Sequence, residues 1–84
     1  MRHARTDALD QLEELIVELR SFAGLKEKSR GVFYRGGRSF LHFHEDPAGL
    51  FADMGVGDDF TRFRVTTRKE RTAFLKAVRA VLTI

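Results

Sequence analysis

Apolar residues recur at helical spacing in two segments, one near each end of the chain. The first stripe runs from Leu9 to Ala23 and the second from Phe74 to Leu82. Side chains three and four residues apart lie on one side of a helix, so such stripes are typical of amphipathic helices. The pattern therefore predicts one helix over residues 7–23 and another over residues 68–82.

Polar residues mark the ends of both helices. Thr6 or Asp7 can cap the first helix, and Gly24 stands where a left-handed residue ends it. Thr67 and Glu70 have the spacing of a capping box at the start of the second helix.

Short alternating runs between the helices predict strands. Gly36-Gly37 suits a two-residue type I′ turn, which pairs Phe33 with Phe40 in a hairpin of residues 32–35 and 38–45. A second turn at residues 46–49 leads into a strand over 50–54. We prefer the register that pairs His42 with Asp53, because a slip by one residue would mix the two faces of the sheet.

The fold class that follows is α+β, a two-layer sandwich with the order αββββα. Residues 60–65 form the fourth strand of the antiparallel meander, and the two helices cover one face of the sheet. Residues 1–5 are expected to be a frayed tail and residues 25–30 a polar link. At 84 residues the chain, 1–84, is expected to form a single domain.

Alternation along the strands sorts their residues into two faces. The expected core face consists of Val32, Tyr34, Leu41, Phe43, Leu50, Ala52 and Met54. The opposite face consists of Phe33, Arg35, Arg38, Phe40, His42, His44, Phe51 and Asp53, and Arg62 and Arg64 join it from the fourth strand. This aromatic and basic face is where we expect function.

Composition narrows the functional classes only slightly. The chain has no cysteine, which excludes disulfides and thiolate metal sites, and no long apolar run that would predict a membrane span. We therefore expect a cytoplasmic protein without a membrane partner. Its net charge of +3 permits contact with nucleic acid without arguing for it.

His42, His44 and Asp53 are the sharpest chemical candidates. Two histidines at i and i+2 of a strand point the same way, and the preferred register adds a carboxylate beside His42. Imidazole nitrogens with a carboxylate are a ligand set for zinc or non-haem iron, and Asp46 could add an oxygen. The alternative is that the histidines are half-exposed strand residues, one of which pairs with Asp53. No nucleophile stands at a spacing that would make a catalytic pair with either histidine.

The phenylalanines and arginines of the same face admit two further interpretations. Rings can stack on bases while arginines hold phosphates, as on sheets that bind single-stranded nucleic acid. The same apolar surface can instead be the seam of a homodimer or bind another protein partner. We expect a small non-catalytic binding module that uses this face, with nucleic-acid binding and divalent-metal activity as alternatives.

Two family resemblances centre on the same stretch. GGRSFLHFHEDPAG resembles the glycine-arginine, His-x-His and following acid of small luciferase-like domains, a largely uncharacterised bacterial group. VFYRGGRSFLHF is similar to the strand pair of MmcQ/YjbR-like proteins. That second resemblance implies a frataxin-like sandwich with helix–sheet–helix order, in a family for which DNA binding has been suggested.

Overall fold

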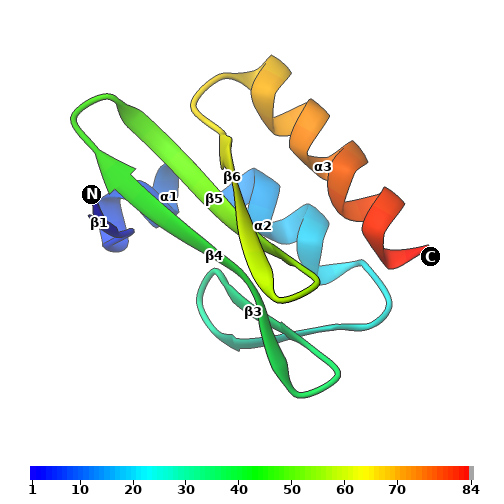
Figure 1. Cartoon of the computed structure of the whole chain (residues 1–84). Helices are drawn as coiled ribbons and strands as arrows, with labels where there is room; N and C mark the ends of the chain where they lie inside the picture. Colours follow the sequence, from blue (N-terminus) through cyan, green and yellow to red (C-terminus); the bar gives the residue numbers. More distant parts are fainter. Residues whose placement is uncertain (84) are drawn as a thin grey trace.

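An antiparallel sheet forms one layer of the molecule and three helices form the other, as the computed structural model of the chain shows for residues 1–83 (Figure 1). The sheet runs in the order β2 (Leu25–Ser29), β3 (Val32–Arg35), β4 (Arg38–Asp46), β5 (Gly49–Val56) and β6 (Asp59–Arg64). The helices are α1 (Thr6–Gln11), α2 (Glu13–Arg20) and α3 (Arg68–Leu82). The predicted α+β sandwich is therefore confirmed.

Two segments that the sequence analysis left without structure are strands. The polar link at residues 25–30 contains β2, and the expected frayed tail contains β1 (Arg2–His3), which pairs with β4. His3 lies opposite His44 in this pairing, and Ala4 N–H donates to Phe43 O. The N-terminal residues thus fill the edge of β4 beyond the end of β3.

The first helix begins at Thr6 with Arg5 as its N-cap and has no side-chain cap, so the predicted cap at Thr6 or Asp7 is wrong. The helix differs from the prediction in two further ways. It bends at Leu12, which is fully buried, so that α1 and α2 are separate helices. It also ends at Arg20 rather than just before Gly24, although Gly24 has the expected positive φ of 91°. The second predicted helix, α3, begins with the predicted capping box. Thr67 accepts from Glu70 N–H, and the Glu70 carboxylate accepts from Thr67 N–H.

Strand register is as predicted between β4 and β5 but not throughout β3 and β4. The pairs from Leu41–Met54 to Glu45–Leu50 are those of the preferred register. In the first hairpin Arg35 faces Arg38 as expected, but a bulge lets Phe33 face Leu41, so Phe40 has no direct partner.

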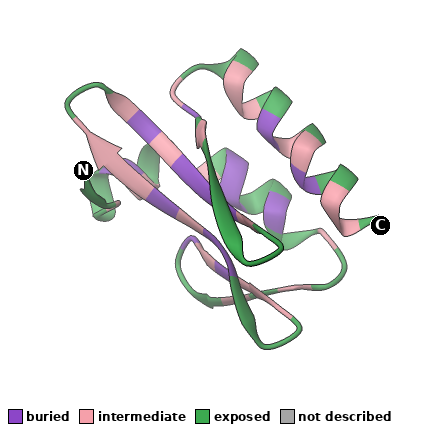
Figure 2. Cartoon of the chain, viewed as in Figure 1, coloured by how far each residue is buried: buried purple, intermediate pink, exposed green. Residues whose placement is uncertain are grey.

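Because of the bulge, the residues of β3 face the opposite sides of the sheet from those predicted. Phe33, expected on the outer face, is fully buried, whereas Val32 and Tyr34, expected in the core, are only partly buried. The remaining core assignments on β4 and β5 are correct. Helix residues complete a single core cluster, in which α2 contributes Leu15, Ile16 and Leu19 and α3 contributes Phe74 and Val78 (Figure 2).

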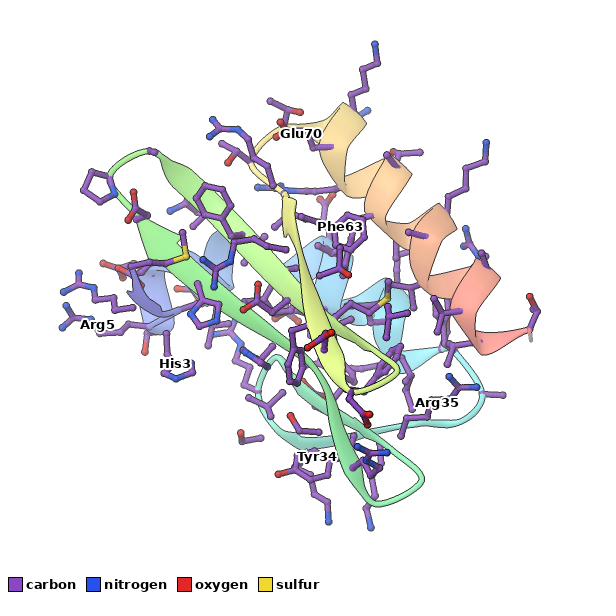
Figure 3. The ribbon with its side chains drawn as sticks, viewed as in Figure 1. His3, Arg5, Tyr34, Arg35, Phe63 and Glu70 are labelled. Carbon is purple, nitrogen blue, oxygen red and sulfur yellow. The ribbon has the colours of Figure 1, made fainter. Side chains whose placement is uncertain are left out.

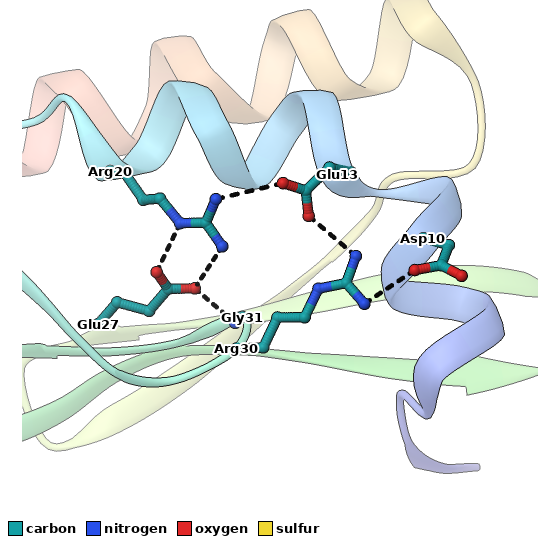
Figure 4. A network of polar contacts seen from close by, with 6 residues as sticks. All are labelled: Asp10, Glu13, Arg20, Glu27, Arg30 and Gly31. Carbon is teal, nitrogen blue, oxygen red and sulfur yellow. Dashed lines mark hydrogen bonds and ion pairs between the residues drawn. The ribbon is translucent and has the colours of Figure 1, made fainter.

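A polar network holds α1 and α2 to the edge of the sheet. Arg20 binds Glu27 of β2 through two hydrogen bonds of 2.6 and 3.2 Å, and Glu27 also accepts from Gly31 N–H (Figure 4). Arg30 joins Asp10 of α1 to Glu13 of α2. The Arg20 guanidinium lowers the pKa of Glu27, so this carboxylate stays ionised in the folded protein.

None of the helices within residues 1–83 has the length and apolarity needed to cross a bilayer.

Gly31 provides a test of the packing between α1 and the sheet. It is buried at φ 77°, and a Cβ there would lie 2.9 Å from Leu9 Cδ2 and 3.3 Å from Phe43 Cδ2. Gly24 has a similar φ but open space around it. We expect Gly31→Ala to cost about 1–3 kcal/mol more in unfolding free energy than Gly24→Ala, since only the former adds overpacking to backbone strain. Urea denaturation of the two variants measures the difference, and equal losses would contradict the packing described here.

Candidate functional site

The face of the sheet turned away from the helices, here called the open face, carries the candidate chemistry. Its side chains come from β4, β5 and β6, whose pairings place His42 beside Asp53 and Asp53 beside Arg62. The open face consists of His42, His44, Phe51, Asp53, Phe60, Arg62 and Arg64.

Asp53 is the buried charge at the centre of the open face. Only 7% of the residue is exposed, and Arg62 binds both of its oxygens, with Nε at 2.8 Å from Oδ1 and Nη2 at 2.9 Å from Oδ2. This fork of charge-assisted hydrogen bonds outweighs burial and lowers the pKa of Asp53. The carboxylate is therefore ionised at neutral pH.

Both strand histidines approach the same oxygen of Asp53. His44 Nε2 lies 3.1 Å from Oδ2, and His42 Nε2 lies 3.7 Å from it. Burial lowers the pKa of His42, and the neighbouring His44 acts in the same direction against the opposing pull of Asp53. His42 is thus a neutral imidazole at neutral pH.

His44 has an unusual environment for a polar ring. Its side chain is 12% exposed, and its Nε2 is buried without a hydrogen-bond partner among residues 1–83. The approach of 3.1 Å to Asp53 therefore brings donor and acceptor atoms together without forming a hydrogen bond. A buried nitrogen left without a partner costs free energy, so this position favours a bound ligand.

Two aromatic neighbours of His42 and His44 were not predicted from the sequence. The His3 ring, on β1, stacks on His44 with centroids 4.8 Å apart, and the Phe60 ring packs edge-on against His42 at 5.1 Å. His3 lies at the opposite end of the sheet from Arg35 (Figure 3). The position of Phe60 could have been predicted, because it lies two residues before Arg62 in an alternating strand. The position of His3 could not, because its strand is too short to show a pattern.

The predicted row of three exposed phenylalanines is not present. Phe33 is fully buried and Phe40 is 4% exposed, so neither offers a platform for a ligand. Phe51 is only partly buried and lies on the open face, with the Arg64 guanidinium carbon 5.9 Å from its ring centroid. The exposed ring of this region is Phe60, at 49%.

The four predicted binding arginines also do not gather in one patch of free charge. Arg62 is committed to Asp53, and Arg64 pairs with Glu70 and donates to Ala48 O. Arg35 and Arg38 instead line an open pocket of about 410 Å³ between the two turns at one end of the sheet. This pocket also contains acidic side chains, and Arg38 approaches Asp58 at 3.8 Å.

The structure therefore brings together His42, His44 and Asp53 of the predicted metal ligands and leaves Asp46 outside the group. The donor atoms of the three all lie within 4.8 Å of one another. Asp46 instead accepts from Ala48 N–H in the turn and lies 3.5 Å from the N-terminal amine.

Comparison with known proteins adds no assignment: no family model, curated protein or solved structure matches this chain.

The Asp53–Arg62 pair predicts a specific dependence of stability on pH. Because the folded-state pKa of Asp53 is lowered, its contribution is complete above the unfolded value of about 3.9 and is lost as pH falls through the folded value. We expect Arg62→Leu to be less stable than the wild type at pH 7, with a difference that shrinks below about pH 4. Urea denaturation from pH 7 to pH 2 measures this, with Arg68→Leu on the exposed side of α3 as the control. A difference that stays constant over this range would contradict the pairing.

Proposed function

We propose that this protein binds a divalent transition-metal ion, with Zn²⁺ as the best fit, through His42, His44 and Asp53. The observation that carries the proposal is the convergence of two imidazole nitrogens on one carboxylate oxygen, with His44 Nε2 buried and lacking a hydrogen-bond partner.

The spacing of the donor atoms supports a tetrahedral ion. Zinc–ligand distances of about 2.0–2.1 Å imply tetrahedral edges of about 3.3 Å. The two nitrogen–oxygen separations, 3.1 and 3.7 Å, lie on either side of that value. Small side-chain rotations would bring the remaining pair, His42 and His44, into the same sphere.

The charge states support binding without prior loss of protons from Asp53 or His42. The pKa values of both groups are lowered, so that Asp53 is an anion and His42 is neutral at pH 7. Metal ions bind imidazole and carboxylate in these forms. Nitrogen and oxygen donors favour zinc and related ions over Ca²⁺ or Mg²⁺, which prefer oxygen donors alone.

Arg62 takes the position of an outer partner in this arrangement. Its Nε binds Asp53 Oδ1 at 2.8 Å and its Nη2 binds Oδ2 at 2.9 Å, which orients the carboxylate so that Oδ2 also faces the two histidines. Hydrogen bonds of this kind fix the orientation of metal-binding carboxylates. Three protein ligands leave a fourth position for water or a further group, and the His3 ring is packed beside both histidines.

Zinc titration with matched histidine variants tests the proposal. We expect one zinc per chain for the wild type, and His44→Ala to weaken affinity by at least the roughly 10–100-fold that loss of an outer partner costs. Asp58→Ala is the control and should leave the affinity unchanged, since it removes an exposed carboxylate outside the group of three. Calorimetry gives stoichiometry and affinity, and equal affinities for the wild type and His44→Ala would refute the site.

Acid should release the ion in a defined range. Protons compete with metal for imidazole, and burial lowers the pKa of His42 below its ordinary value of 6.5. We therefore expect affinity to be maintained from pH 8 to about pH 6.5 and to fall steeply below that. A chelator-competition assay across this range measures the profile, and an affinity that is flat down to pH 4 would exclude histidine ligands.

A further inference from the structure

β6 is an edge strand whose outer side is free of other strands within residues 1–83. The sheet order ends at β6, and five of its six residues are exposed, so that most of the strand is green in Figure 2. Free edges of this length are templates for pairing with another chain, and proteins commonly blunt them with lysine, proline or bulges.

The opposite edge of the sheet has two of these features, whereas β6 is protected only by its charged residues, Asp59, Arg62 and Arg64. β2 carries Lys26 and Lys28, both exposed, and a register shift between Glu27 and Ser29 disturbs it. β6 has the sequence DFTRFR, with no lysine and no proline, and its pairing with β5 is regular over all six residues. β6 is therefore the less protected of the two edges and the one better suited to pairing with another strand.

The direction of the backbone N–H and C=O groups identifies which residues of β6 can form hydrogen bonds with a further strand. Val65 N–H donates to Leu50 O at 2.8 Å, so Val65 faces β5. Because these directions alternate along an antiparallel strand, Thr61 and Phe63 also face β5. The N–H and C=O groups of Phe60, Arg62 and Arg64 therefore point outward from the sheet.

We propose that two copies of this chain associate through antiparallel pairing of β6 with β6, with Thr61 opposite Thr61 at the two-fold axis. The pairing joins two sheets into one, with both helical layers on the same side. It is a separate proposal from metal binding and does not require it.

Symmetry and charge select this register. Opposite side chains in a two-fold antiparallel pair lie on the same face, so the axis passes through one of the residues 60–63. An axis at Arg62 sets two guanidinium groups against each other, and an axis at Phe60 or Phe63 pairs only three residues of each strand. The axis at Thr61 pairs five residues of each strand.

The favoured register also makes complementary contacts on the open face. It sets Phe60 opposite Arg62 of the second copy, in the hydrogen-bonded positions, and Asp58 opposite Arg64 of the second copy. An arginine over an aromatic ring and an ion pair are each favourable across strands. Arg62 can present the face of its guanidinium to the ring while its nitrogens bind Asp53, and Arg64 binds Glu70 and Ala48 through Nε and Nη1, which leaves Nη2 for Asp58. Phe60, 49% exposed in the single chain, would become covered.

A disulfide placed at the axis tests both association and register. The chain has no cysteine, and opposite residues in a non-hydrogen-bonded antiparallel pair have Cα atoms about 4.5 Å apart, within disulfide range. We expect Thr61→Cys to form a covalent dimer rapidly under mild oxidation, at twice the 9.6 kDa mass of the chain. Thr72→Cys, at an exposed site on α3, is the matched control and should remain mostly monomeric.

A charge at the axis provides the second measurement. Thr61→Lys sets two ammonium groups against each other and should raise the dimer dissociation constant by up to roughly fivefold, whereas Thr72→Lys should leave it unchanged. Sedimentation equilibrium gives the constants. A wild type that stays monomeric up to millimolar concentration, equal cross-linking of the two cysteine variants, or equal constants for the two lysine variants would each overturn the proposal. Zinc titration of Thr61→Lys reports separately on the metal site, which this substitution does not touch.

Discussion

The burial of one carboxylate on an uncovered sheet face is the constraint around which this molecule is organised. Asp53 is 7% exposed, although none of the helices within residues 1–83 packs over it, because side chains of three strands surround it. A buried anion is tolerated only when it is paired, and Arg62 provides the pair with two hydrogen bonds. The half-buried histidines on the other side of Asp53 then share one of its oxygens, and this is where the proposed metal ion would bind. The fold positions the candidate site through this one residue.

The part of the site that could be predicted from the sequence is the part that strand geometry determines. The turn at residues 46–49 and the alternation of β4 and β5 permit one register with a consistent apolar face, and that register places His42 opposite Asp53. The same reasoning placed Arg62 on this face, because β6 alternates from its start. The capping box at Thr67 followed from spacing alone, since both of its hydrogen bonds are local.

The rest depended on interactions between distant segments or on one extra residue. The bulge at Phe40 reverses the sides of β3, and so it moves Phe33 into the core, but neither residue type signals it. β2 has too many charges to read as a strand, and it exists because Arg20 and Glu27 tie it to α2. β1 has only two residues and forms because β4 extends beyond β3, which leaves an edge to fill. The predicted apolar platform is therefore absent, because Phe33 and Phe40 are buried, and the predicted group of His42, His44 and Asp53 is what the open face presents.

X-ray absorption at the zinc edge, on the protein loaded with one equivalent of zinc, tests the central claim most directly. The account predicts a first shell of nitrogen and oxygen at about 2.0–2.1 Å, with the scattering signature of two imidazoles. It also predicts the loss of one imidazole in His44→Ala. An all-oxygen shell, or a shell with the same number of imidazoles in the wild type and His44→Ala, would contradict the assignment of His42, His44 and Asp53 as a metal centre.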